Sequence, residues 1–193
     1  KFGVLALGWA LVGYFGFLDL GMGRALTQYL ASADQAGVSR QEQATVACAA
    51  RRLLGSLALG LALLLTLLLP WLAGFVQMPA NLHMQTIAAA PLLALSVPLA
   101  MWFACSAGVL EARSRFAAVN SVRIPAGVGN FVAPWLVSLF TADLFWVISG
   151  VVVVRLAGAL GMAWWARPEF ALPAPRWPSA GIRQLLRFGG WMT

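Results

Sequence analysis

Most basic residues of this chain fall in short groups, and the stretches between the groups are almost entirely apolar. The 13 Lys and Arg residues include three groups, in residues 40–52, 113–123 and 167–187. The alternate connections, residues 77–85 and 141–143, contain neither Lys nor Arg. Short loops rich in Lys and Arg stay on the cytoplasmic side of a membrane. This alternation predicts a polytopic membrane protein and the side on which each loop lies.

The overall composition excludes a soluble domain. Hydrophobic residues make up 61% of the 193 residues and charged residues 10%, whereas soluble domains have roughly 25% charged residues. A soluble fold of this size could not bury so much apolar side chain. The net charge of +7 does not indicate nucleic acid, because the basic residues flank apolar stretches instead of forming one exposed face. We expect anionic membrane lipids at the cytoplasmic leaflet as partners, and no nucleic acid.

The apolar stretches predict an all-α polytopic bundle. A helix needs about 20 apolar residues to cross the hydrocarbon core. Five spans meet this requirement, at approximately residues 2–32, 53–76, 86–110, 124–140 and 144–166. The basic loops orient the first, third and fifth spans toward the cytoplasm.

The spans suggest a simple domain organisation. Residues 1–166 form a partial transmembrane bundle, and residues 167–181 are rich in proline, which predicts an extended cytoplasmic linker. Residues 182–193 look like the start of another span. Because the chain begins with Lys1 and ends within this apolar stretch, we expect it to be a fragment of a longer protein.

Small residues predict where helices pack closely. Gly158 and Gly161 lie in the fifth expected span, and Gly55 and Gly60 lie in the second. Glycine lets helix backbones approach one another within a membrane. The sequence therefore predicts close helix contacts at both pairs.

A polar, glycine-rich stretch interrupts the first expected span. Asp19 and Arg24 lie there among Gly16, Gly21 and Gly23, which are candidate hinge residues because glycine eases departures from helical geometry. Irregular backbone at membrane depth is tolerated only against protein or a water-filled cavity. One interpretation places both charges on a polar cavity, where Arg24 meets an anionic substrate and Asp19 either pairs with Arg24 or exchanges a cation. The other makes Asp19 a helix cap and Arg24 an interfacial residue.

Further polar residues lie in or near the last two spans. Arg155 is at the middle of its span, where an arginine costs at least about 2.5 kcal/mol, so we expect a partner or a wet cavity; a bond to a backbone carbonyl is the alternative. Asn120, Arg123 and Asn130 bracket the start of the fourth span. They are candidates for a polar cavity or for interhelix hydrogen bonds, which is the commoner role of asparagine in membranes.

Several kinds of chemistry have no candidate residues. The sequence has no His, Cys and Glu cluster with metal-ligand spacing, and no glycine loop followed by Lys that would cradle a phosphate. His83 is the single histidine, so no Ser–His–Asp set exists. Paired carboxylates for glycosyl chemistry are also missing. This stretch by itself does not look like an enzyme, and we expect no metal site and no cofactor.

Three motifs resemble those of one family. Residues 14–27 are YFGFLDLGMGRALT, which resembles the second-span signature of bacterial polysaccharide biosynthesis proteins, the O-antigen and oligosaccharide flippases. Residues 108–116 are GVLEARSRF, which with Val119 and Asn120 is similar to the turn between that family's fourth and fifth spans. Residues 186–192 are LRFGGWM, similar to the start of its seventh span.

The resemblance implies membership of the multidrug/oligosaccharidyl-lipid/polysaccharide exporter superfamily. Its members have two similar helical bundles around a central cavity. The chain would then hold the second to sixth spans of the first bundle and the start of the seventh, and its partner would be the missing C-terminal bundle. The implied function, in the bacterial cytoplasmic (inner) membrane, is to flip a polyprenyl-diphosphate-linked oligosaccharide to the outer leaflet by alternating access, for polysaccharide, O-antigen or cell-envelope biosynthesis.

The implied cargo suggests roles for the charged residues. A diphosphate needs cationic partners, and guanidinium offers paired donors to phosphate oxygens. Arg24 and Arg155 are the expected partners, and Asp19 is a hypothetical ion-coupling residue. Three alternatives remain: a multidrug cation exporter of the same superfamily, a membrane-embedded glycosyltransferase or ligase acting on lipid-linked sugars, and a non-transporting scaffold.

Overall fold

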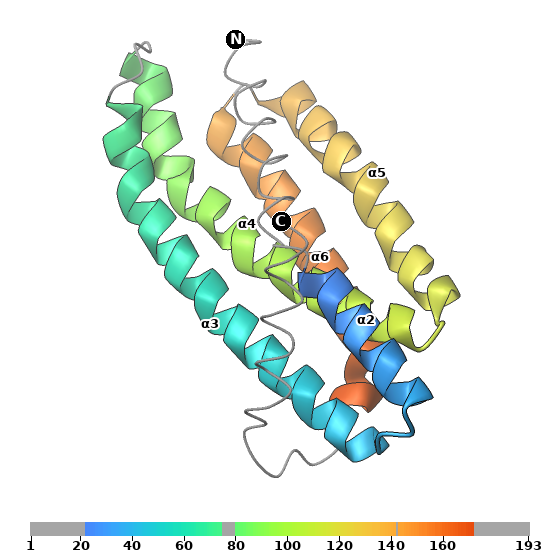
Figure 1. Cartoon of the computed structure of the whole chain (residues 1–193). Coiled ribbons are helices and arrows are strands. Elements are labelled where there is room, and N and C mark those ends of the chain that lie inside the picture. Colours follow the sequence, from blue (N-terminus) through green and yellow to red (C-terminus); the bar gives the residue numbers. More distant parts are fainter. Residues whose placement is uncertain (1–21, 75–79, 142, 172–193) are drawn as a thin grey trace.

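All the regular elements that the structure describes are α-helices (Figure 1). The computed structural model describes residues 22–74, 80–141 and 143–171. The helices are α2 (Met22–Gln35), α3 (Arg40–Ala73), α4 (Ala80–Ala112), α5 (Phe116–Phe140) and α6 (Leu144–Phe170). The described residues form no strand, and the predicted all-α fold class is confirmed.

Four of these helices are long and apolar enough to cross a membrane. Their candidate spans are Arg40–Trp71, His83–Ala112, Phe116–Phe140 and Leu144–Phe170. Each exceeds the roughly 20 residues that the hydrocarbon core requires, so the predicted polytopic character is confirmed. The short helix α2 is the described part of the first expected span; the earlier residues of that span lie outside the described residues.

Helix α3 begins at Arg40, well before the apolar stretch that identifies its span. All of residues 43–50 are buried. Val46 and Ala50 belong to a core cluster that includes Leu26 of α2. Tertiary packing, which supplies most of the stability of helices in proteins, therefore extends α3 beyond the membrane-spanning segment.

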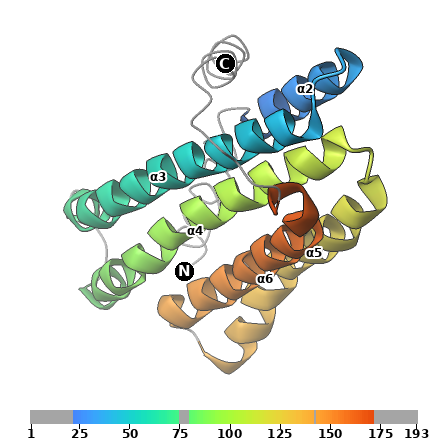
Figure 2. The same ribbon diagram turned by 90° about the horizontal axis from the view of Figure 1, so that it is seen from below.

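Helix α4 is the centre of the bundle. It packs against α2, α3, α5 and α6, and Figures 1 and 2 show α3 on one side of it and α6 on the other. Buried small residues such as Ala89 and Ala94 line it and permit close helix approach. Large side chains on the outer faces, such as Leu63 of α3 and Ile124 of α5, are exposed, as expected where hydrocarbon is the solvent.

Helices α5 and α6 run antiparallel and pack closely against one another at glycines along their length. A Cβ atom on Gly129 of α5 would lie 2.8 Å from Cγ1 of Val154, and one on Gly161 of α6 would lie 3.2 Å from Cγ1 of Val122. Gly158 approaches α5 in the same way. The predicted close contacts at Gly158 and Gly161 are confirmed.

The prediction for the other glycine pair is wrong for the described part of the chain. No atom of another described helix lies within 4 Å of a Cβ built on Gly55 or Gly60. Neither glycine therefore makes a close contact with another described helix. Glycine content indicates where a helix could pack closely, but not which face does so.

Helix α6 continues through Pro168 to Phe170, although the sequence predicted a linker from residue 167. A proline removes one helical N–H and its ring opposes the carbonyl of the preceding turn, but here the helix ends shortly afterwards. The last turn is held because Phe170 packs against two core clusters. The remainder of the expected linker and the start of the next span lie outside the described residues.

The basic connections meet at one end of the bundle. The α2–α3 and α4–α5 turns and the end of α6 lie together at the bottom of Figure 1, and the end of α3, the start of α4 and the end of α5 lie at the opposite end. The positive-inside rule predicts that the basic end faces the cytoplasm, and for this reason we refer to it as the cytoplasmic end.

Candidate functional site

Arg155 lies in the inward stripe of α6 at the middle of its span. Ile148, Val152 and Ala159 are buried and share a core cluster with residues of α4. Arg155 lies three residues after Val152 and four before Ala159, and this spacing places residues on one face of a helix. Its side chain is half-buried. Counting from Leu144, Arg155 falls near the centre of a segment of about 20 residues that crosses the hydrocarbon core.

Asn130 of α5 lies at nearly the same depth. The adjacent Gly129 contacts Val154, the residue before Arg155. The Oδ1 atom of Asn130 is buried and accepts no hydrogen bond from any described residue. Within the described ranges Arg155 forms no ion pair. A donor and an acceptor with unused hydrogen-bonding capacity therefore lie in one layer at mid-membrane depth.

The start of α2 packs tightly against α4. A Cβ atom on Gly108 would lie 2.5 Å from the carbonyl oxygen of Gly23. The hydroxyl of Thr27 is 2.9 Å from that carbonyl oxygen and 3.0 Å from the carbonyl oxygen of Gly108. Two of the three segments that resemble family motifs are thus in direct contact, which explains why both contain glycine at this point.

The structure does not bring Arg24 and Arg155 into one described pocket. Gly23 is buried and Arg24 is exposed on α2. Arg24 follows Gly23, which contacts Gly108 near the cytoplasmic end of α4. This contact places Arg24 about two helical turns closer to the cytoplasmic end than Arg155. Asp19, Gly16 and Gly21 lie outside the described residues. The diphosphate, ion-coupling and hinge roles all stay predictions.

The two other polar candidates lie on the exposed side of α5. Asn120 and Arg123 are both exposed, and Arg123 donates to Oε1 of Glu111 at the α4–α5 turn. Neither lines the pocket described below. Their proposed roles in a cavity stay predictions.

An ion-pair network centred on the buried side chain of Arg113 joins three helices at the cytoplasmic end. Arg113, whose side chain is 7% exposed, lies 3.4 Å from Oδ1 of Asp34 on α2 and 3.1 Å from Oε2 of Glu169 on α6. Gln43 of α3 donates to Oδ1 of Asp34 at 3.5 Å and to the carbonyl oxygen of Val38 at 2.8 Å. The network fixes the cytoplasmic ends of these helices relative to one another.

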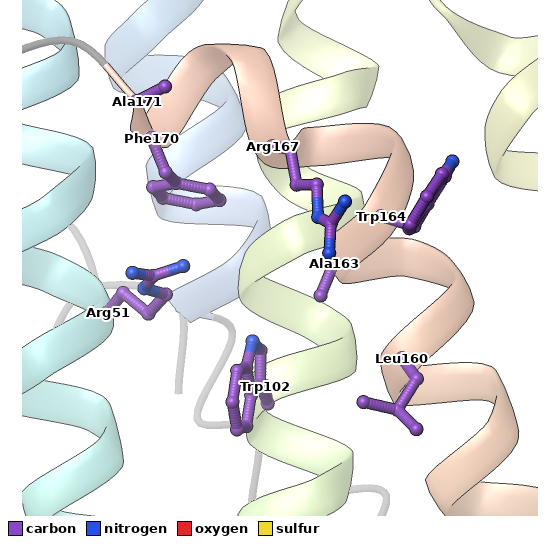
Figure 3. Close-up of a pocket in the computed structure, with 8 residues that line it drawn as sticks. All are labelled: Arg51, Trp102, Leu160, Ala163, Trp164, Arg167, Phe170 and Ala171. Carbon is purple, nitrogen blue, oxygen red and sulfur yellow. The ribbon is translucent and has the colours of Figure 1, made fainter.

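A pocket of about 720 Å³ opens between α3, α4 and α6 near the cytoplasmic end. We call it the α3–α6 groove. Its lining residues are Arg51, Trp102, Leu160, Ala163, Trp164, Arg167, Phe170 and Ala171. Figure 3 shows Arg51 extending from α3 toward the ring of Phe170, with Trp102 of α4 between the outer helices.

The sequence predicted Arg51 and Arg167, the two arginines of the α3–α6 groove, only as parts of cytoplasmic connections. A partial signal was present, because Trp164 precedes Arg167 by three residues and lies next to it on one helix face. The partnership of Arg51 with Phe170 joins α3 to α6, so no local pattern could have indicated it.

No metal centre is formed by the described residues. They contain no group of three or more His, Cys, Asp or Glu side chains that could hold a metal ion. Cys48 and Cys105 are both buried free thiols.

One curated protein is significantly similar to this chain. A curated protein of Shigella flexneri aligns with 192 residues of this chain at 24% identity and is described as "Putative O-antigen transporter". The chain is similar to a protein named for O-antigen transport. The alignment covers 100% of this chain and 45% of the relative, so the chain spans about half the relative's length. The similarity supports the resemblance to O-antigen flippases that the three motifs indicate.

No protein-family model matches the chain, and no solved structure gives a significant match.

Proposed function

We propose that this chain is part of a transporter that moves a polyprenyl-diphosphate-linked oligosaccharide from the cytoplasmic to the outer leaflet of a bacterial cytoplasmic membrane. The observation that carries the proposal is the alignment of the whole chain with a relative named for O-antigen transport. The four membrane-length helices supply the multi-pass architecture that such a protein needs. A second bundle would complete the transporter, and rocking of the two bundles would give alternating access.

The mid-membrane polar layer suits the cargo of this proposal. A diphosphate carries negative charge through the membrane and needs cations along its path, and guanidinium presents two parallel donors to phosphate oxygens. Arg155 lies on the inward stripe of α6 at mid-depth. Asn130 lies at nearly the same depth, and its Oδ1 atom accepts no hydrogen bond from a described residue. In the proposal Arg24 receives the diphosphate nearer the cytoplasm, and Asp19 couples transport to an ion.

The charges favour an anionic cargo over a cationic drug. A cation exporter needs carboxylates at membrane depth. Among the described residues, every Asp and Glu lies at or beyond the helix ends, and the charged residue at mid-depth is Arg155.

Complementation of a flippase-deficient strain tests the proposal. The full-length protein should restore surface polysaccharide, and Arg155→Ala should reduce it more than tenfold with unchanged protein level, because a desolvated phosphate contact is lost. Arg155→Lys should give an intermediate result, since it keeps the charge but loses the paired donors. Arg52→Ala removes an exposed cytoplasmic arginine and is the matched control, with polymer unchanged.

Each other outcome points to a different conclusion. Normal polymer in both Arg24→Ala and Arg155→Ala would reject their assignment as diphosphate partners. Failure of the unmodified protein to restore polymer, with resistance to cationic drugs instead, would favour the multidrug exporter. In a strain lacking the protein, lipid-linked oligosaccharide should accumulate on the cytoplasmic face; accumulation on the outer face would favour a ligase.

A further inference from the structure

The α3–α6 groove lies at the depth of lipid headgroups. The outer end of the α3 span is Trp71, and about 20 residues of helix cross the hydrocarbon core, so Arg51 lies at its cytoplasmic boundary. Counting in the same way from Leu144 of α6 places Arg167 just beyond that boundary. Two helices thus independently place the arginines of the groove where phosphate groups of the cytoplasmic leaflet lie.

Both arginines are held by aromatic rings instead of carboxylates. The Cζ atom of Arg51 lies 4.3 Å from the ring centre of Phe170, and that of Arg167 lies 4.0 Å from the ring centre of Trp164. Neither forms an ion pair with any described residue. The arginines at this end that do pair with carboxylates are Arg40, Arg113 and Arg123. Stacking on a ring orients the guanidinium plane and leaves its N–H edges free for an anion.

The remaining walls of the groove are apolar. Trp102 of α4 and Leu160 of α6 are exposed there, and the eight lining residues include no carboxylate, side-chain amide or hydroxyl. The lining side chains offer no hydrogen-bond acceptor for the hydroxyl groups of a glycan. An ammonium headgroup would lack a carboxylate. A phosphate with attached hydrocarbon matches both the charge and the walls.

We propose that the α3–α6 groove binds an anionic phospholipid of the cytoplasmic leaflet. Arg51 and Arg167 contact the phosphodiester, and an acyl chain lies against Trp102 and Leu160. Juxtamembrane arginines attract anionic lipids, and charge-assisted bonds to phosphate add geometric specificity. Arg155 does not line the groove, so the lipid site is separate from the mid-membrane polar layer and does not depend on the identity of the cargo.

Site-specific photocrosslinking in the full-length protein tests this proposal. A photoreactive benzophenone amino acid replaces Leu160, which lines the groove, or Ile124 of α5, which is similarly exposed (57% and 63%) but lies outside it. The protein is reconstituted in bilayers with equal amounts of phosphatidylglycerol and phosphatidylcholine, and adducts are identified by mass spectrometry. Phosphatidylglycerol adducts should be enriched at position 160 and not at position 124.

Removal of either groove arginine should weaken this enrichment. Arg51→Gln or Arg167→Gln should lower the phosphatidylglycerol adduct at position 160 about fivefold, the effect of one arginine near an anionic surface. Arg52→Gln changes the net charge equally, but Arg52 does not line the groove, and the adduct should persist.

The proposal fails if phosphatidylcholine is captured equally, or if Arg51→Gln and Arg167→Gln have no more effect than Arg52→Gln. Capture of lipid-linked oligosaccharide would make the groove part of the cargo path. A peptide adduct would assign it to another segment of the chain or a second copy. Suppression of the adduct by inorganic phosphate would indicate a site for a small anion. Each of these results overturns the phospholipid assignment.

Discussion

Arg113 shows how one buried cation can set the geometry of several helices. Its guanidinium bridges Asp34 of α2 and Glu169 of α6 from the end of α4. The side chain is 7% exposed, whereas Asp34 is half-exposed. Removing the cation would leave Glu169 without an ion-pair partner among the described residues, whereas Asp34 would keep Arg40 at 3.8 Å.

Arg113→Ala should therefore lower the stability of the full-length protein. We expect a loss of about 1.5–3 kcal/mol, the range for hydrogen bonds that involve charged groups. The measurement is thermal or denaturant unfolding of the purified protein in detergent micelles, followed by circular dichroism.

Arg123→Ala is the matched control, because it also removes one arginine and one ion pair at the cytoplasmic end. Arg123 is half-exposed, and exposed pairs contribute less than about 1 kcal/mol. Equal losses for both variants would show that the network around Arg113 contributes no more than a surface pair.

The crossing of α2 and α4 depends on the absence of a side chain at Gly108. A Cβ atom there would meet the carbonyl oxygen of Gly23 at 2.5 Å and the hydroxyl of Thr27 at 3.2 Å. Gly108→Ala should force the two helices apart and destabilise the protein by about 1–3 kcal/mol, as overpacking generally does. A chemical crosslink between cysteines placed on α2 and α4 should become slower to form in parallel with the loss of stability.

Gly127→Ala in α5 controls for the intrinsic effect of the substitution. A Cβ atom on Gly127 meets no described residue within 4 Å, and alanine favours a helix by up to about 1 kcal/mol relative to glycine. This variant should be neutral or slightly stabilised. A neutral Gly108→Ala would contradict the close contact between α2 and α4.

The sequence predicted the type of each described membrane helix but not all of its limits. Long apolar runs bounded by basic loops were sufficient for the fold class and the number of described spans. The early start of α3 at Arg40 and the extension of α6 through Pro168 depend on tertiary contacts, which no local pattern contains. For the same reason the packing glycines of α6 were predicted correctly, whereas Gly55 and Gly60 were not.

The candidate site was only partly predictable for a related reason. Arg155 is evident in the sequence because a charge within an apolar run is rare, and in the structure it lies on the inward stripe of α6. The α3–α6 groove was missed because its residues come from three helices far apart in sequence. Arg24, predicted to act with Arg155, lies about two turns from it along the bundle axis.

The separation of basic and uncharged connections predicts the topology of the complete bundle. In a protein with Cys48 and Cys105 replaced by alanine, Ser114→Cys reports on the α4–α5 turn and Thr141→Cys on the α5–α6 connection. A membrane-impermeant maleimide added to spheroplasts should label only position 141, and in inside-out vesicles only position 114. The reverse pattern would contradict the assignment of the basic end to the cytoplasm.

The glycine contacts between α5 and α6 limit how this bundle can rearrange. Because backbone and side chain interlock at several levels from Gly129 to Gly161, sliding or rotation of one helix against the other would create steric overlap at each level. The pair should therefore move as a rigid unit, with any displacement during the proposed transport cycle taken up at its boundary with α4. Spin labels on α5 and α6 would keep a constant separation throughout the cycle.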